Sequence, residues 1–486
     1  MECKDSDEPK MEMDNTTQDP SAWAQKQSDE TSRFNLRCTT HPYLAVAILC
    51  FINLINYMDR FTIAGVLHNI QKDFEISDST SGLLQTVFIC SFLLLAPLFG
   101  YLGDRYNRKV TMSVGIIIWT SVTFGSSFVS KSQFWLLLVT RGLVGIGETC
   151  FSTIAPTIIG DLFASGKRTR VLSIFYLFIP VGSGMGFVLG AGMQRLTGDW
   201  HWAFRVTPCL GGIGLILLCI FVPDPKRGAS EHFQTVSKTS WSQDIKYLFS
   251  NHSFLLSTMG VTTMAFVAGA LGFWMPLFLF RAQVAQGARE DCLDQACSTK
   301  ESLIFGALTV ATGVIGVIAG AEIARRYKKN PHADPTICAI ALLITAPSLF
   351  FAIVLAQTSI AASYVFITIG EIFLSFNWAI VADMLLYVVI PTRRSTAEAF
   401  QITVGHLLGD AGSPYLVGIV SDAIKSGKPD TNVWKFRSLK YSFTICTFVA
   451  VLGGVFFLLT IRYIKDDKEK AQQIIKGDEK KGDIPG

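Results

Sequence analysis

Long apolar segments alternate with short polar ones along almost the whole chain, and this pattern predicts membrane-spanning helices. A helix needs about 20 largely apolar residues to cross a bilayer. Twelve segments meet that requirement: 43–67, 80–103, 110–129, 134–162, 170–194, 203–223, 254–280, 302–324, 336–357, 359–390, 396–422 and 441–464. The chain is therefore expected to be an all-α membrane protein with twelve transmembrane helices.

The polar segments divide these spans into two sets of six. The longest polar interruption between spans, 224–253, is interpreted as a cytosolic linker between an N-terminal half at 43–223 and a C-terminal half at 254–464. Residues 1–42 are polar and acid-rich without an apolar core, which predicts a disordered tail and no cleavable signal peptide. The Lys/Asp/Glu-rich segment 465–486 predicts a second disordered tail.

The two halves also repeat each other at a spacing of about 220 residues. Gly100–Lys109, which follows the second span, reappears in degenerate form after the eighth span as Gly320–Lys329. Acidic residues of the fourth and tenth spans correspond in the same way: Gly147-Glu148 with Asp161, and Gly370-Glu371 with Asp383. A charge inside a span costs about 3 kcal/mol on insertion scales. A duplicated bundle that keeps such a charge in both copies indicates a transporter with its site between the repeats.

Composition supports the membrane class and excludes several functions. Of 486 residues, 50% are hydrophobic and only 16% are charged, whereas soluble chains carry about 25% charged residues. The net charge of +4 is scattered, so no nucleic-acid partner is expected. The chain has no phosphate-binding loop of an ATP-driven pump and no paired catalytic motif, which argues against an enzyme. No cofactor or metal is expected, and the protein is expected to act as a monomer.

Positive residues in the short loops predict the orientation. The loops after spans two, four, eight and ten contain twelve of them: Arg105, Arg108, Lys109, Lys167, Arg168, Arg170, Arg325, Arg326, Lys328, Lys329, Arg393 and Arg394. The loops after spans one, three, five and nine contain three: Lys72, Lys131 and Arg195. By the positive-inside rule both tails are cytosolic. The loop after span eleven is a conflict, because it is also rich in lysine yet falls outside.

One pair of cysteines differs from the others in its surroundings. Cys292 and Cys297 lie in a polar loop, which this topology places outside the cytosol. In an oxidising compartment they are a candidate disulfide, although spacing alone does not prove a bridge.

The fourth span carries two charges on one face. Arg141 and Glu148 are seven residues apart, which separates them by about 10 Å along a helix. Intramembrane charges are usually functional, so Arg141 is a candidate substrate-binding residue and Glu148 a candidate proton-coupling residue. A purely structural salt bridge is the alternative.

The first span ends in a similar group. Asp59 lies about 12 Å below the outer end of its span, nearly level with Arg141, so these two are expected to pair. Asp59 is the second candidate for proton coupling. Arg60 points about 100° away round the helix and is expected to be freer to bind an anionic ligand.

In the eleventh span, His406 and Asp410 lie four residues apart on one face, near the expected position of Glu371. An isolated histidine in an apolar helix is usually a packing residue. With two acids nearby, His406 becomes a candidate for carrying a coupling proton or contacting a headgroup. Gly182, Gly186 and Gly190 in span five are expected to serve helix packing.

The decapeptide after span two is a candidate gate. Gly100 would allow close helix approach, and Asp104 and Arg105 could latch one side of the bundle to the other half. A simple positive anchor is the alternative reading of the basic residues. Asp161 and Asp383, at the ends of spans four and ten, are interpreted as interface or helix-end residues.

Together these motifs resemble known sequences. The decapeptide and Arg141-x-x-x-Gly145-x-Gly147 resemble the major facilitator superfamily. Longer stretches are similar to its Spinster family: Ile55–Leu67, Arg141–Glu148, Ser152–Phe163, Gly198–Ala203 and His406–Tyr415.

The resemblance, over about 43–465, implies the major facilitator fold, with two six-helix pseudo-repeats that rock about a central site. It also implies export of lysophospholipids or of sphingolipids such as sphingosine phosphate, from the plasma membrane or an endolysosomal membrane. The family's intramembrane acids and arginines correspond to Asp59, Arg60, Arg141 and Glu148, and its cavity positions to Tyr176, Glu371 and His406. A carrier of a small polar anion or sugar, and a membrane sensor that transports nothing, remain alternatives.

Overall fold

The structure is a computed structural model that describes residues 42–163, 165–225, 241–288, 299–390 and 393–482, and within these ranges every regular element is a helix. The first half contains α2 (Pro42–Gly65), α3 (Leu67–Phe74), α4 (Asp78–Arg105), α5 (Arg108–Ser126), α6 (Phe134–Leu162), α7 (Ser165–Thr197), η1 (Trp200–Trp202) and α8 (Ala203–Phe221). The second half contains α9 (Trp241–Ser250), α10 (His252–Ala285), α11 (Thr299–Arg326), α12 (Ala333–Leu355), α13 (Ile360–Val388), α14 (Arg394–Gly405), η3 (His406–Asp410), α15 (Gly412–Lys425) and α16 (Asn432–Gly482).

Each of the twelve predicted spans corresponds to helical structure. Among the described residues, ten helices are long and apolar enough to cross a membrane. The other two spans are α5 and the eleventh span, which is divided into α14, η3 and α15. The prediction of an all-helical membrane protein is confirmed.

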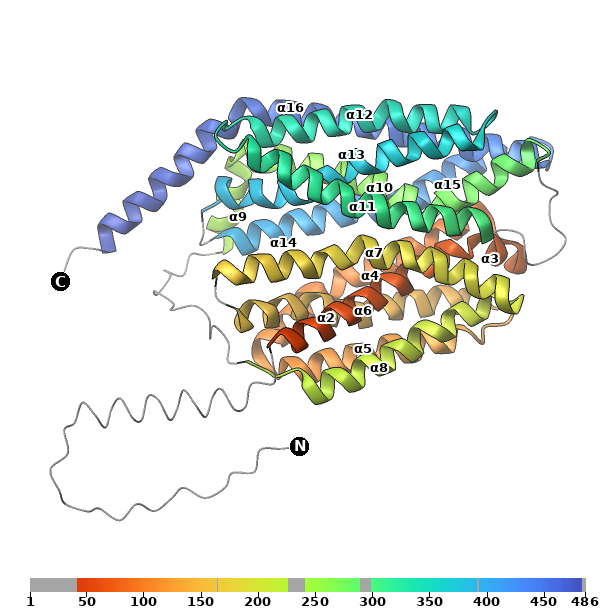
Figure 1. Ribbon diagram of the computed structural model, residues 1–486, viewed down its shortest axis with the longest axis horizontal. Coiled ribbons are helices and arrows are strands. Elements are labelled where there is room, and N and C mark those ends of the chain that lie inside the picture. The colour runs from red at the N-terminus through yellow and green to blue at the C-terminus, as the bar shows by residue number, and fades with distance from the viewer. Residues whose placement is uncertain (1–41, 164, 226–240, 289–298, 391–392, 483–486) are drawn as a thin grey trace, which may run out of the picture.

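The helices form two groups that lie against each other (Figure 1). In the first group α2 packs on α7 and α8, and α6 packs on α4 and α5. In the second, α10 and α12 both pack on α16, and α13 packs on α11 and α12. The groups meet mainly where α7 contacts α11 and where α4 contacts α15. This arrangement leaves two helix pairs to carry most of the interface between the halves.

Short polar side chains mark where several helices begin. Ser77, Asn107, Asn251 and Ser359 each accept a hydrogen bond from a backbone N–H three residues later, at the starts of α4, α5, α10 and α13. Such caps satisfy donors that the first helical turn leaves free. Between α3 and α4, Glu75 adopts a left-handed conformation (φ 52°) that lets the chain reverse. The α3–α4 turn therefore fixes where Asp78 lies.

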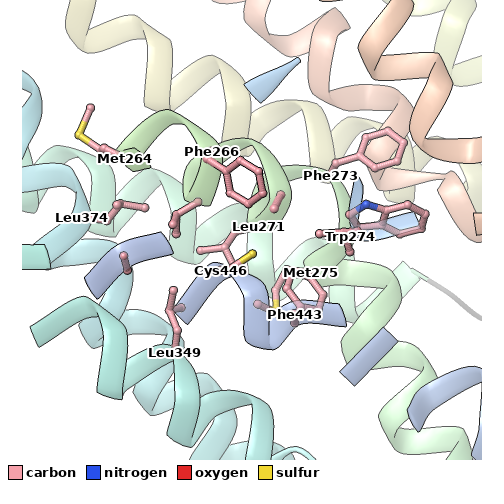
Figure 2. Close-up of a cluster of buried hydrophobic side chains, with 14 of the residues drawn as sticks. Met264, Phe266, Leu271, Phe273, Trp274, Met275, Leu349, Leu374, Phe443 and Cys446 are labelled. Atoms are coloured by element: carbon pink, nitrogen blue, oxygen red, sulfur yellow. The ribbon is translucent and has the colours of Figure 1, made fainter. Parts of the chain in front are cut away.

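The core of the second half is built around α10, which is buried along most of its length. Figure 2 shows side chains of α10, from Met264 to Met275, beside Phe443 and Cys446 of α16, with Leu349 of α12 and Leu374 of α13 nearby. The indole of Trp274 donates a hydrogen bond to the carbonyl of Pro414 in α15 (2.9 Å). This apolar packing makes α10 a rigid support for the divided helix beside it.

Three segments differ from the sequence-based expectation. The proposed linker 224–253 contains a short helix, α9, next to α10. Residues 465–482 are helical as a continuation of α16, so the prediction of a disordered tail is wrong for them. The eleventh span contains a π-turn, in which the N–H of Ala411 bonds the carbonyl of His406 (2.9 Å). Gly409 faces α10 closely enough that a Cβ would lie 2.7 Å from that of Ala265.

The glycines of the fifth span serve packing, as expected. A Cβ on Gly182, Gly186 or Gly190 would lie 2.4–2.7 Å from backbone oxygens of α2. Close backbone contact is how helices associate in membranes, where the hydrophobic effect contributes little between them. The α2–α7 contact therefore fixes the position of Asp59 and Arg60 within the first half.

Candidate functional site

A group of buried charges occupies the middle of the first half. Arg141 and Glu148 of α6 have 0% and 1% of their surface exposed. None of the three guanidinium nitrogens of Arg141, nor Oε1 of Glu148, has a hydrogen-bond partner among the described residues. Asp59, Arg60 and Arg141 all lie near enough to Glu148 to interact electrostatically. Buried polar groups normally have partners, so this group has unused capacity to bind a ligand or a proton.

Asp59 has other partners than the one expected. Its carboxylate accepts hydrogen bonds from the indole of Trp119 (3.1 Å) and the hydroxyls of Thr207 (2.5 Å) and Thr123 (3.3 Å). The expected direct pair with Arg141 does not form, because these donors on α5 and α8 occupy the carboxylate. Asp59 is thereby held entirely within the first half.

Arg60 is not a free cation, contrary to the expectation. Its guanidinium donates to the carboxylate of Asp410 in η3 (3.2 Å), an ion pair that joins the two halves. Its Nε has no partner among the described residues. Arg60 also lies over the ring of Phe88 (5.1 Å to the centroid), and Arg141 approaches the same ring (5.7 Å). Phe88, which is fully buried, therefore contacts both arginines.

The expected proximity of His406 and Asp410 is confirmed. Nδ1 of His406 lies 2.8 and 3.0 Å from the two carboxylate oxygens of Asp410. Beside them, the hydroxyl of Thr86 in α4 donates to the carbonyl of Ala411 (2.6 Å). The π-turn therefore contacts the first half through both a side chain and a backbone carbonyl.

The remaining cavity candidates, Glu371 and Tyr176, have other neighbours. Glu371 accepts hydrogen bonds from Thr312 (2.7 Å) and Thr309 (3.5 Å) of α11, not from His406. Tyr176 of α7 is 47% exposed and lies within electrostatic range of Glu398 in α14. The second half thus holds an acid among hydroxyls, whereas the first half holds two cations.

Among the described residues, three of the proposed gate residues, Gly100, Arg105 and Asp383, form no hydrogen bond or ion pair across the halves. A Cβ on Gly100 would meet nothing within 4 Å, and Arg105 is exposed and lies over Tyr101 of its own helix. The side chain of Asp104 lies outside the described residues. Asp161 forms an ion pair with Arg108 inside the first half, and Asp383 is exposed. The interface or helix-end role of Asp161 and Asp383 stays a prediction.

A further polar network joins the halves at the end of the bundle away from the starts of α2 and α10. There Arg281 of α10 donates to both oxygens of Asp78 (2.7 and 2.9 Å), and Ser421 of α15 donates to the same carboxylate (2.7 Å). Asp422 accepts hydrogen bonds from the backbone N–H groups of Asp78 and Ser79 (3.2 and 2.8 Å). Bidentate contacts of this kind are strong and directional. This network, here called the Asp78 latch, closes that end of the bundle.

The Asp78 latch was not predictable from the sequence as a unit. Asp78 follows the capping residue Ser77, and this signal predicts only a helix start. Arg281 lies more than 200 residues away, and its pairing depends on how the halves meet. The candidate disulfide, Cys292 and Cys297, lies outside the described residues.

Comparison with known proteins identifies the family. The model of the major facilitator superfamily matches residues 49–413. Protein spinster homolog 3 of Danio rerio is 59% identical over 437 residues, which cover 90% of this chain and 88% of the relative. The chain belongs to the Spinster family. The human protein of the same name is 56% identical (91% and 87% covered), and protein spinster homolog 1 of Mus musculus is 55% identical (90% and 84%).

Solved structures agree with the Spinster assignment at the level of the fold. A bacterial homologue of human lysosomal transporter Spinster, inward-facing and unoccupied, matches with a TM-score of 0.75 at 19% identity, covering 88% of this chain and 98% of that one. The inward-facing xylose transporter XylE from E. coli matches with a TM-score of 0.64 at 14% identity, covering 88% and 99%. This Spinster chain is thus a major facilitator transporter and not an enzyme.

The Asp78 latch predicts a specific stability defect in this Spinster protein. Arg281→Gln leaves the Asp78 carboxylate buried without its cation, and loss of one partner of a buried pair typically costs about 3–5 kcal/mol. We expect a clear fall in the thermal unfolding midpoint of the detergent-solubilised protein, partly recovered when Asp78→Asn is added.

The matched control is Lys131→Gln. Lys131 pairs with Asp73 (3.2 Å) but is 71% exposed and lies within one half, so the midpoint should hardly change. An equal fall in both single variants would show that the latch contributes no more than a surface pair.

Proposed function

We propose that this protein moves a single-chain amphiphilic lipid, such as sphingosine phosphate or a lysophospholipid, across a membrane by alternating access. The observation that carries the proposal is a set of buried donors in the first half that have no hydrogen-bond partner among the described residues. These are all three guanidinium nitrogens of Arg141, Nε of Arg60 and the amide nitrogen of Asn56. Guanidinium groups suit phosphate because they present several N–H donors in a fixed geometry.

Arg60 and Arg141 would act in succession. Arg60 keeps 8% of its surface exposed at the boundary between the halves, whereas Arg141, which also lies over the Phe88 ring, is fully buried. A headgroup therefore meets Arg60 first, and movement of the Phe88 ring would open the way to Arg141. Tyr176, Glu371 and His406 are proposed to contact the rest of the substrate.

Glu148 is the stronger candidate for the coupling proton. Both oxygens of Asp59 already have donors, whereas Oε1 of Glu148 has none among the described residues. A carboxyl group with a free oxygen can take up a proton or a new donor without losing an existing bond. A ligand that binds the inward-facing and outward-facing states equally does not shift the equilibrium between them. Proton exchange at Glu148 would supply a difference between the two states and so give the transport cycle its direction.

The six-helix halves at 43–223 and 254–464 are proposed as the bodies that rock, with 224–253 as their linker. The Asp78 latch holds one end closed, and Gly100, Asp104, Arg105, Asp161 and Asp383 are proposed to take part in closing the other end. If both tails are cytosolic, the latch is external and this conformation faces inward. The plasma membrane and an endolysosomal membrane are both compatible with this arrangement.

The lysine-rich loop that conflicts with this orientation is partly neutralised within itself. Lys425 and Lys435 pair with Asp430 (2.9 and 3.8 Å). The hydrogen bond from Lys425, followed by the charges of both lysines, holds the pKa of Asp430 below its ordinary value. The loop therefore presents less positive charge than its lysines suggest.

The substrate proposal is tested by reconstituting the purified protein into liposomes with labelled lysophospholipids and sphingosine phosphate. We expect uptake of these lipids that small organic anions and sugars do not compete away, and a loss of at least about tenfold in Arg60→Gln and Arg141→Ala. Efficient competition by a small anion would favour the carrier of polar solutes. Binding of lipid without any uptake would favour a sensor.

Glu148→Gln tests whether Glu148 carries the coupling proton. Glutamine keeps the shape of the side chain but cannot titrate. Accumulation driven by a proton gradient should disappear in this variant, while exchange of lipid down its own gradient continues. If Glu148→Gln keeps the pH dependence of the unmodified protein, the proton is carried elsewhere, and Asp59 becomes the candidate.

Cys292 and Cys297 test the orientation. A membrane-impermeant maleimide should label them on intact cells after mild reduction, and the signal should vanish in Cys292→Ser/Cys297→Ser. Labelling only after the cells are permeabilised would reverse the orientation and place the tails outside.

A further inference from the structure

A group of positive charges around the start of α16 has no role in the function proposed above. Within it, Lys425 and Lys435 form ion pairs with Asp430 (2.9 and 3.8 Å). Arg437 and Lys440 have no carboxylate partner among the described residues, yet the charge of Arg437 acts directly on Lys440. Two like charges held together without a counterion attract an anion more strongly than either charge does alone.

An indole ring also lies within this group. The charged ends of Lys428 and Arg437 lie 5.2 and 5.6 Å from the centre of the Trp434 ring. Lys440 donates a hydrogen bond to the side chain of Gln357 (2.9 Å), just beyond the end of α12, which packs beside α16 (Figure 1). Tryptophan and basic side chains are typical of the level at which lipid headgroups lie. The start of α16 therefore has the composition of a membrane interface.

Arg437 and Lys440 lie on a face of α16 that the rest of the protein leaves largely uncovered. Val433, Tyr441 and Phe448 are 39%, 52% and 63% exposed. Helical spacing places these three side chains within about 40° of Arg437 round the helix. Because α16 is long and apolar enough to cross a membrane, this face is expected to contact lipid chains. The two cations thus lie at the end of a lipid-facing surface.

The same segment contributes to the Asp78 latch, so it lies at the closed end of the bundle. The guanidinium of Arg281 donates to the carbonyl of Lys435 (3.4 Å). The hydroxyl of Ser421 donates to that of Ser438 (3.1 Å). The short loops after spans two, four, eight and ten, which are rich in arginine and lysine, lie at the other end, and the positive-inside rule makes that end cytosolic. The rule therefore does not account for the cations at the start of α16.

We propose that Arg437 and Lys440 bind the phosphate of an anionic membrane phospholipid in the leaflet at the closed end of the bundle. The phosphodiester oxygens accept hydrogen bonds from both side chains, and one acyl chain lies along Tyr441 and Phe448. Basic residues near a membrane surface attract anionic lipids, and the attraction grows with each added charge. The bound lipid is a component of the membrane and not the substrate, so this site goes beyond the proposed function and does not depend on it.

The position of the two cations favours a lipid over a soluble anion or an acidic protein. Arg437 and Lys440 are only partly exposed and lie within about three helical turns of Phe448. A headgroup at the membrane surface reaches both cations while its chain stays in the bilayer. A soluble partner would first meet Lys428 and Asp430 in the exposed connection before α16, where a carboxylate already offsets part of the charge.

The experiment uses phosphatidylglycerol that carries a photoactivatable diazirine in one acyl chain, with the purified full-length protein in detergent micelles. After irradiation, mass spectrometry of the peptides measures labelling of residues 433–448. We expect unlabelled phosphatidylglycerol to compete at about tenfold lower concentration than phosphatidylcholine. Equal competition by phosphatidylcholine would reduce Arg437 and Lys440 to general interfacial anchors and overturn the site. Competition by soluble glycerol phosphate at the same concentration as phosphatidylglycerol would also overturn it, because the site would then bind a free anion.

Two double variants test the charges themselves. Arg437→Gln/Lys440→Gln should lower the labelling of residues 433–448 about tenfold, because the phosphate loses both cations. Arg437→Lys/Lys440→Arg keeps both charges and should retain the labelling. Unchanged labelling in the glutamine variant would show that these side chains do not hold the lipid.

Lys328→Gln/Lys329→Gln is the matched control. These lysines are exposed and lie at the opposite end of the bundle, just after α11. The control removes the same number of charges and should leave the labelling of residues 433–448 unchanged. An equal loss of labelling in this variant would attribute the effect to the net charge of the protein and contradict a local site on α16.

Discussion

The cost of holding charge inside an apolar helical bundle governs how this structure is arranged. Arg141 and Glu148 are almost completely buried, and their free atoms have no hydrogen-bond partners among the described residues. Asp59 and Arg60 lie within electrostatic range of both side chains, and the close packing of α2 on α7 holds them in place. Unlike an apolar core, this cluster offers unpaired donors on Arg60 and Arg141 and an unpaired oxygen on Glu148, among the described residues, to a ligand of suitable charge.

The two halves surround their buried acids with different groups. In the second half Glu371 is stabilised by the hydroxyls of Thr309 and Thr312, whereas in the first half Glu148 shares its surroundings with two arginines. The repeat visible in the sequence thus preserved an acid in each half but not its environment. The first half is better suited to bind an anion, and the second contributes acids and a histidine.

The sequence predicted what is local or periodic. All twelve spans, the packing of Gly182 and its neighbours, and the contact of His406 with Asp410 depend on spacing along one helix, which a sequence displays directly. Sequence reasoning did not predict which side chains on different helices would pair. The estimated depth along the membrane places Asp59 and Arg141 at one level, but it does not show which way each side chain faces round its helix. In the structure Trp119, Thr123 and Thr207 donate hydrogen bonds to the Asp59 carboxylate instead. The Arg281–Asp78 pair could not be foreseen for the same reason, since it depends on how the halves meet.

The π-turn in the eleventh span links these features. One extra residue in a helical turn rotates everything after it by about 100° relative to a continuous α-helix. Because the N–H of Ala411 bonds the carbonyl of His406, the segment before the turn and α15 after it present different faces to the first half. The side chain of Asp410 reaches Arg60, while the carbonyl of Ala411 accepts the Thr86 hydroxyl. Beyond the turn, Ser421 reaches the Asp78 latch. A continuous helix with the same sequence would rotate either Asp410 or Ser421 away from its partner, so the π-turn is what allows one helix to serve both the charged site and the latch.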